Sequence, residues 1–309
     1  MAKQRITEIL RTGKILVSDG AWGTFLYQSG LKPGECPDEW SLSHPDIVKE
    51  IALRYVEAGA ELIETNTFGA NRFKLQHYGL QDKVAAINEA AARLSREATG
   101  DDKYVIASIG PTGKMLLMGD VTEEEFYDCF REQAIALEKG GADAICIETM
   151  SDGDEAVQAI KAAKENTGLE IIATFTFDKT PLGEYRTMMG LRPAEAMRRA
   201  LEAGADMIGT NCGNGMERMI DIVKEIRTAF PDTAIVVQAN AGLPVSLEGI
   251  DTFPDTPEIM TSYIPLLIEA GANIIGGCCG TTPEHIKMLS QKIHLLNTKG
   301  TKIFHKEHK

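Results

Sequence analysis

One short phrase occurs four times along the chain, and it constrains the fold more than any other feature does. Its copies read EAGAELI, KGGADAI, EAGADMI and EAGANII and begin at residues 57, 139, 202 and 269. Each copy follows an amphipathic stretch and precedes a short apolar run. This pattern indicates a helix that ends at glycine, a tight turn and then a buried strand. The repeat therefore predicts a chain in which helices and strands alternate.

Further apolar runs lie between the copies, and a helical pattern follows each of them. The predicted strands are 14–19, 62–67, 104–110, 144–150, 169–177, 207–212, 235–240 and 274–280. Because these runs are apolar throughout, they favour a parallel sheet that helices cover on both sides. Such a set closes most simply into an α/β fold of the (β/α)8 TIM barrel type, a single domain over residues 1–296. An open doubly wound sheet is the alternative.

Local signals mark several helix ends. Thr122 and Glu125 fit a capping box, and Thr256 and Thr282 each precede a proline at the expected first helical position. Pro265 breaks the pattern of the seventh helix and should kink it or shift its start. Residues 297–309, which are rich in lysine, are expected to form a frayed tail or the stub of a linker.

Composition narrows the choice of partners and of compartment. The formal net charge of −13 is spread along all 309 residues, which argues against nucleic acid or an anionic membrane as a partner. Charges interrupt the N-terminal stretch MAKQRITEILRTGK, so it does not fit a signal peptide. No apolar run reaches the ~18 residues of a membrane span. A cytoplasmic location is expected, and there cysteines serve as thiols or metal ligands.

In a barrel of this kind the active site lies at the C-terminal ends of the strands. The polar or reactive residues predicted there are Asp19, Glu64 to Thr67, Ser108, Glu148, Thr149, Cys212, Asn240, Cys278 and Cys279. Three thiols that meet at one rim are best explained by a soft divalent ion, and zinc suits sulfur ligands. Three protein ligands would leave the fourth position of zinc for an exchangeable group, which is typical of a catalytic site.

The vicinal pair Cys278-Cys279 must lie where the last strand breaks, since successive strand residues point to opposite faces. Gly276, Gly277 and Gly280 supply the necessary backbone freedom. A redox disulfide within the pair is an alternative, but it leaves Cys212 unexplained. The other cysteines, Cys36, Cys129 and Cys146, are expected to be small buried hydrophobic residues.

Glu148 ends the apolar run AICIE and should point into the mouth of the barrel, where a carboxylate needs a cationic partner or a ligand. The ammonium group of an amino-acid substrate would serve. Asp19, taken alone, is more typical of a residue that caps the next helix. The turn from Gly20 through Ala21 to Thr24 could offer free backbone N–H groups to a substrate carboxylate.

Several segments together resemble the homocysteine S-methyltransferase family. They are DGAWGT (19–24), ETNTFG (64–69), SIGP (108–111), CIET (146–149), GTNCG (209–213) and GGCCGT (276–281). Within the family, residues 64–80 and 238–244 are most similar to the homocysteine-binding module of cobalamin-dependent methionine synthase. Those two segments read ETNTFGANRFKLQHYGL and QANAGLP.

The resemblance implies a function and a set of site residues. Cys212, Cys278 and Cys279 would bind zinc, and Asn240 would be an exchangeable fourth ligand. Asp19 and Glu148 would hold the amino group of homocysteine, whose zinc-bound thiolate would be methylated to methionine. The implied donor is methylcobalamin on a separate domain or corrinoid protein, because this chain ends where methionine synthase continues into folate and cobalamin domains.

Other readings stay open at this point. The same chemistry could use S-methylmethionine, betaine or another methyl donor, or could act on another thiol. A non-enzymatic redox or metal-sensing thiol protein is a further alternative. A zinc hydrolase or aldolase is disfavoured, because the six histidines lie away from the predicted strand ends. The sequence leaves the oligomeric state open.

Overall fold

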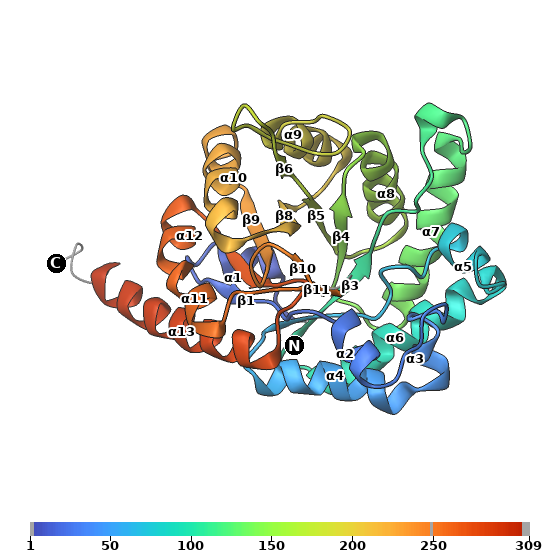
Figure 1. Cartoon of the computed structure of the whole chain (residues 1–309), viewed down its shortest axis with the longest axis horizontal. Helices are drawn as coiled ribbons and strands as arrows, with labels where there is room; N and C mark the ends of the chain where they lie inside the picture. The colour runs from blue at the N-terminus through green and yellow to red at the C-terminus, as the bar shows by residue number, and fades with distance from the viewer. Residues whose placement is uncertain (1–2, 248–249, 305–309) are drawn as a thin grey trace.

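The computed structural model describes residues 3–247 and 250–304, and its centre is an eight-stranded parallel barrel surrounded by helices (Figure 1). The barrel strands are β1 (Leu16–Val17), β2 (Leu62–Glu64), β3 (Tyr104–Ile109), β4 (Ala144–Met150), β5 (Glu170–Phe175), β8 (Met207–Gly215), β9 (Ala234–Asn240) and β12 (Ile274–Gly277). They are ordered β1-β12-β9-β8-β5-β4-β3-β2. A parallel bridge between Ser18 and Leu62 joins β1 to β2 and closes the ring. The predicted barrel is confirmed, and the open sheet is wrong.

Of the helices, one precedes the first barrel strand, one follows the last, and the others lie between successive strands. They are α1 (Ile6–Leu10), α2 (Gly23–Gln28), α3 (Trp40–Ser43), α4 (Pro45–Glu57), α5 (Arg72–Gln76), α6 (Val84–Thr99), α7 (Glu123–Lys139), α8 (Gly153–Asn166), α9 (Pro193–Ala203), α10 (Met216–Ala229), α11 (Pro257–Ser262), α12 (Ile264–Ala270) and α13 (Pro283–Phe304). Single 3-10 turns, η1 (Gln81–Lys83) and η2 (Leu116–Met118), lie before α6 and α7. Two hairpins, β6 (Asp178–Lys179) with β7 (Tyr185–Arg186) and β10 (Val245–Leu247) with β11 (Ile250–Thr252), are inserted in loops.

The structure tests the predicted helix ends. Thr122 and Glu125 form the predicted capping box at the start of α7. Pro265 divides the seventh helical region, because α11 ends at Ser262 and α12 begins at Ile264 with the proline in its first turn. There its missing N–H leaves no helical bond unmade. Helix α13 continues to Phe304, past the predicted domain boundary at 296, and its last turns extend away from the barrel in Figure 1.

The four-fold phrase forms the N-terminal edge of the barrel. Its third residue is a glycine with φ between 94° and 111° in every copy, which ends the preceding helix in the left-handed conformation. Its fifth residue is Glu61, Asp143, Asp206 or Asn273, and each accepts a hydrogen bond from a backbone N–H of the neighbouring strand. The donors are Val17, Val105, Ile171 and Ile235, at 2.8 to 3.3 Å. The repeat thus aligns alternate strands at this end.

Apolar side chains fill the lower part of the barrel. Ile106, Cys146, Ile172 and their neighbours pack there against Ile6 and Leu10 of α1. Glu170 binds the backbone N–H groups of Ile6 and Thr7 at 2.7 and 3.0 Å, which holds α1 across the barrel floor. The barrel is therefore closed at its N-terminal end, and open space remains at the other end.

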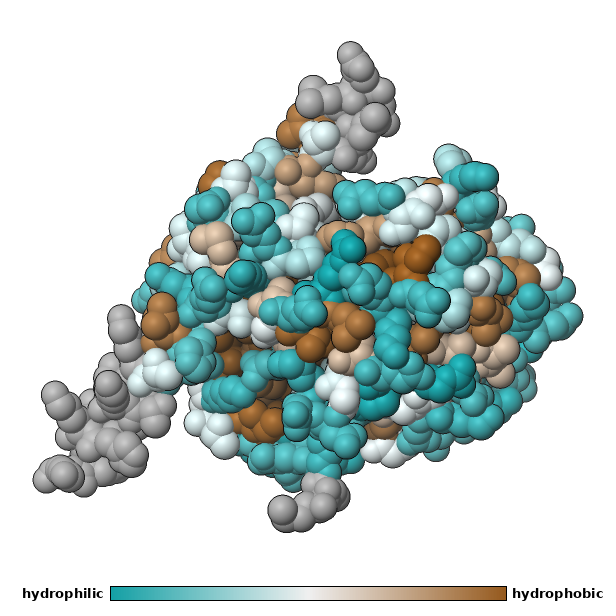
Figure 2. All heavy atoms as spheres, turned by 90° about the horizontal axis from the view of Figure 1, so that it is seen from below, coloured by the Kyte–Doolittle hydropathy of each residue, from teal (hydrophilic) through white to brown (hydrophobic). Residues whose placement is uncertain are grey.

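One face of the molecule is mostly hydrophilic (Figure 2). Figure 2 shows a face on which hydrophobic residues form small, separate patches among hydrophilic ones, as is usual for folded domains. In the part of the chain that the structure describes, no helix combines the length and the apolar character that crossing a membrane requires.

Candidate active site

A cavity of about 550 Å³ lies at the C-terminal end of the barrel. We call it the mouth cavity. Segments at the ends of every barrel strand except β5 contribute to it. Its lining includes Gly20 to Thr24, Glu64 to Gly69, Ser108, Glu148, Thr149, Cys212, Gln238 and Gly277 to Cys279. Among the predicted site residues, Asp19 and Asn240 lie behind this lining, fully or almost fully buried.

Cys212, Cys278 and Cys279 form a thiol cluster in the wall of the mouth cavity. Their sulfur atoms all lie within 4.8 Å of one another, and the Sγ atoms of Cys212 and Cys279 are 3.8 Å apart. Cys212 belongs to β8 and the other two follow β12. Strand β9, which ends at Asn240, lies between those strands. The structure therefore brings together three thiols from distant parts of the chain, an arrangement that can hold a metal ion.

The backbone around the thiol cluster is unusual. Cys212 has a φ of 57°, a left-handed conformation that non-glycine residues seldom adopt. A Cβ atom on Gly277 would lie 2.4 Å from Thr281 Oγ1, and one on Gly276 would lie 1.9 Å from Ser18 Oγ. Strand β12 ends at Gly277, so the vicinal cysteines follow the strand, as the glycines around them predict.

The three thiols of the cluster differ in pKa. Hydrogen bonds from the Cys278 and Cys279 thiols lower the pKa of Cys212 to about 3, and a hydrogen bond from Asn240 contributes. The hydrogen bond to Cys212 raises the pKa of Cys279 to about 12, and hydrogen bonds to Cys212 and Cys279 raise that of Cys278 well above its ordinary value. Hydrogen bonding within the cluster therefore favours the thiolate form at Cys212 over the other two cysteines.

Three carboxylates lie buried beside the cluster: Asp19, Glu64 and Glu148. Oδ2 of Asp19 accepts hydrogen bonds from Trp22 Nε1 and from the Glu64 N–H, both at 2.9 Å. Oε1 of Glu64 accepts one from Gln238 at 2.7 Å. Glu148 accepts hydrogen bonds from Ser108 and from Asn211.

These carboxylates lack a cation. Burial raises the pKa of Asp19 and of Glu148 to about 7, and it raises that of Glu64 well above its ordinary value. Repulsion from Glu148 adds to the effect at the other two. Among the side chains of residues 3–245 and 252–298, no lysine, arginine or histidine forms a salt bridge with any of them. A bound cation would therefore favour their ionised forms.

Glu64 is a part of this group to which sequence reasoning gave no role. The signal was present, because Glu64 ends the apolar run ELIE just as Glu148 ends AICIE. Gln238 was likewise missed, because a glutamine two residues before the end of β9 forms no distinctive sequence pattern. In the structure its side chain lines the cavity and binds Glu64.

Two hydrogen bonds to the Ala21 backbone fix the turn that follows β1. The Ala21 N–H donates to Thr281 Oγ1 at 3.1 Å, and the Ala21 carbonyl accepts from the buried Tyr55 hydroxyl at 2.6 Å. The expectation of free N–H groups in this turn is therefore wrong for Ala21. The Gly20 N–H has no hydrogen-bond partner among the described residues. Thr281 also donates to the Cys278 carbonyl at 2.7 Å, so it connects the turn to the thiol cluster.

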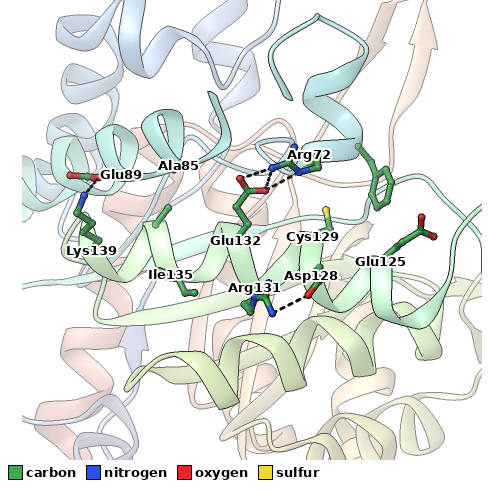
Figure 3. A pocket seen from close by; sticks show the side chains of 12 residues that line it. Arg72, Ala85, Glu89, Glu125, Asp128, Cys129, Arg131, Glu132, Ile135 and Lys139 are labelled. Atoms are coloured by element: carbon green, nitrogen blue, oxygen red, sulfur yellow. Dashed lines mark hydrogen bonds and ion pairs between the residues drawn. The ribbon is translucent and has the colours of Figure 1, made fainter. Parts of the chain in front are cut away.

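A larger cavity, of about 710 Å³, lies outside the barrel between α5, α6 and α7 (Figure 3). Its charged side chains pair with one another, as in the ion pairs Arg72–Glu132 and Lys139–Glu89, both at 2.8 Å. Cys129 lines it but is almost fully buried. None of the predicted site residues contributes to it. The chemistry suggested by the sequence therefore belongs to the mouth cavity.

Fold and cavity define a (β/α)8 barrel whose reactive groups stand at the C-terminal ends of its strands. A family model described as homocysteine S-methyltransferase matches residues 16–293, and the chain belongs to that family. This confirms the resemblance seen in the motifs.

The chain is also similar to two curated relatives and, in fold, to a solved structure. The chain is 31% identical to methionine synthase of Mycobacterium leprae (strain TN), over 94% of this chain and 25% of that protein. For methionine synthase of Mycobacterium tuberculosis (strain ATCC 25618 / H37Rv) the identity is 29%, over 91% and 25%. The chain thus spans about a quarter of the length of these relatives. The metallated form of the homocysteine methyltransferase MmuM from Escherichia coli has the same fold, with a TM-score of 0.75, 22% identity and coverage of 92% and 98%.

Proposed function

We propose that this protein methylates the sulfur of homocysteine to give methionine, and that Cys212, Cys278 and Cys279 hold a zinc ion for this reaction. The observation that carries the proposal is the position of the thiol cluster. It faces the same cavity as the buried carboxylates of Glu64 and Glu148, and the carboxylate of Asp19 is buried behind the lining of that cavity. An amino acid with a thiol side chain matches both features, and membership of the family names that amino acid as homocysteine.

The residues present fit a zinc ion. Two sulfurs bound tetrahedrally to zinc with bonds of about 2.3 Å lie roughly 3.8 Å apart. The Sγ atoms of Cys212 and Cys279 have that separation. Asn240 Oδ1 is buried beside them and has no partner among the described residues, which supports Asn240 as an exchangeable fourth ligand. When bound, zinc would remove the proton of an incoming thiol and keep its sulfur nucleophilic at neutral pH.

The carboxylates and the turn beside the thiol cluster bind and orient the substrate. Asp19 and Glu148 receive the ammonium group, and Glu64 adds negative charge beside them. The turn at Gly20 and Ala21 receives the substrate carboxylate, chiefly through the free Gly20 N–H. Thr281 keeps this turn in place relative to Cys278. These contacts hold the substrate sulfur at the thiol cluster and point it toward the open end of the cavity.

We propose methylcobalamin on a separate domain or corrinoid protein as the methyl donor. Similarity to methionine synthases, of which this chain matches only about a quarter, supports this donor. A donor of that size can reach the substrate only through the open end of the barrel, because α1 closes the other end.

The test is to load the protein with zinc and homocysteine and to offer methylcobalamin, S-methylmethionine, betaine and methyltetrahydrofolate in separate reactions. Methionine should form fastest from methylcobalamin and should disappear when zinc is removed by a chelator. Faster methionine formation from another donor would replace the corrinoid. Full activity of metal-free protein would overturn the zinc site. Zinc and thiol binding without methionine from any donor would favour a metal-sensing thiol protein.

A further inference from the structure

A single buried side chain, that of Asn211, connects the ends of three neighbouring barrel strands. Its Nδ2 donates to Glu148 Oε2 at 3.0 Å and to Thr149 Oγ1 at 2.7 Å. Its Oδ1 accepts from the Thr149 N–H and from Thr174 Oγ1, both at 2.8 Å. An asparagine amide has two N–H donors and one oxygen with two lone pairs. All of this capacity is therefore used, and the side chain is fully buried.

The same side chain holds a strained piece of backbone. Thr149 and Cys212 are the non-glycine residues with positive φ in the described ranges, at 60° and 57°. Thr149 directly follows Glu148, and Cys212 directly follows Asn211. A β-branched residue in this conformation persists only when its surroundings hold it. Asn211 does so by binding both the N–H and the hydroxyl of Thr149.

The regular backbone pairing of the strands is interrupted near Thr149 and Asn211, and hydrogen bonds of the Asn211 side chain take its place. The pairing of β4 with β5 shifts register between Ile147 and Met150, and that of β8 with β9 shifts between Asn211 and Gly215. A break in register leaves backbone groups without ladder partners. Asn211 supplies one for Thr149, and at the same break it donates to the carboxylate of Glu148.

We propose that Asn211 is a positioning residue that orients Glu148 toward the ammonium group of the substrate. The inference rests on the proposed function, in which Glu148 binds that group. Asn211 does not line the cavity, so it acts through Glu148 and Thr149 rather than by touching the substrate. Its loss should weaken homocysteine binding while zinc stays bound, because it makes no hydrogen bond to a cysteine side chain.

The test uses Asn211→Asp, which keeps the shape, removes both donors and places a second carboxylate beside Glu148. The KM for homocysteine should rise about 10-fold or more, the effect of losing a hydrogen bond to a charged group. The kcat should change less than KM, and zinc per protein should equal that of the wild type. Calorimetric titration with homocysteine gives the same comparison without a methyl donor.

Asn88→Asp is the matched control. Asn88 is equally buried, and its amide donates to the carbonyls of Ala70 and Val84 at 2.8 Å, away from the cavity. This variant should lower the melting temperature and leave KM unchanged. Thr174→Val removes one hydrogen bond from Asn211 Oδ1 and should raise KM about threefold, which covers the case that Asn211→Asp does not fold.

Three results would overturn the inference: an unchanged KM in a folded Asn211→Asp or Thr174→Val protein, an equal rise in Asn88→Asp, or loss of zinc from Asn211→Asp. Failure of the proposed function looks different, because the wild-type protein itself would then bind no homocysteine.

Discussion

The polar groups at the two ends of the barrel differ in whether they have hydrogen-bond partners. At the N-terminal end, Asp143, Asp206 and Asn273 each bind a strand N–H and a basic side chain, so their charges and lone pairs are used. At the C-terminal end, buried polar atoms lack partners in the part of the chain that the structure covers. These atoms are Ser18 Oγ, Asp19 Oδ1, Thr210 Oγ1, Gln238 Oε1 and Asn240 Oδ1.

This difference suggests that the polar groups at the N-terminal end stabilise the fold and that those at the C-terminal end serve binding. A buried polar atom without a partner costs about 1–3 kcal/mol, and a bound ligand that supplies the partner removes this cost. The N-terminal end holds the strands in register, and under the proposed function a metal ion and a substrate would provide partners for the polar atoms at the C-terminal end. Substitutions at the two ends should therefore affect different measurements.

The largest effect is expected at the thiol cluster. Cys212→Ala should abolish both zinc binding and methyl transfer, because two remaining thiols cannot hold the ion in its reactive arrangement. Zinc content by atomic absorption and methionine formation are the measurements. Cys129→Ala, in the wall of the outer cavity, is the matched control and should keep both. Wild-type zinc content in Cys212→Ala would rule out the assignment.

Removing one carboxylate charge should weaken substrate binding and leave the metal in place. Glu148→Gln should raise the Kd for homocysteine roughly 30-fold or more, since loss of one partner of a buried charge pair costs about 2 kcal/mol or more. Calorimetric titration measures this. Glu155→Gln alters another buried carboxylate, one that binds Thr112 and does not line the cavity, and should leave the Kd unchanged. Equal affinities in Glu148→Gln and wild type would remove Glu148 from the site.

The same variant should show a smaller, pH-dependent effect on stability. Burial raises the pKa of Glu148 from 4.5 to about 7, so the folded protein binds this proton more tightly than the unfolded chain. Its favourable contribution is complete below pH ~4 and is lost as the pH rises through 7. Zinc-free Glu148→Gln should thus be more stable than wild type at pH 8, by on the order of 2 kcal/mol, with the difference vanishing near pH 4. Urea unfolding at both pH values checks this, and a difference independent of pH would contradict it.

The fold was more predictable from the sequence than the details of the site. Strand 144–150 was predicted to the residue, because the repeated phrase marks where each helix ends and the next strand begins. Strand β8 runs to Gly215, beyond the predicted end at 212, because a register shift after Asn211 prolongs it. The hairpins β6–β7 and β10–β11 were missed, since strands of two or three residues leave no periodic pattern.

In the site, the thiols were predictable because strand ends alone bring them to one rim. The roles of Asn211 and Thr281 were not, since each depends on where a side chain points across a strand break. The free N–H expected at Ala21 failed for the same reason, because Thr281 comes from the far end of the chain to occupy it.

The smallest effect on function is expected at the N-terminal end. Asp206 accepts a hydrogen bond from the Ile171 N–H at 2.8 Å and pairs with Lys164. Asp206→Ala should lower the free energy of unfolding by about 1–3 kcal/mol, because it leaves that N–H without its side-chain partner. Homocysteine affinity and zinc content should stay at wild-type values. The control Asp154→Ala breaks only an exposed pair with Arg199 and should change stability by less than about 0.5 kcal/mol. A change in homocysteine affinity in Asp206→Ala would mean that the two ends of the barrel are coupled, and the division between a stabilising end and a binding end would fail.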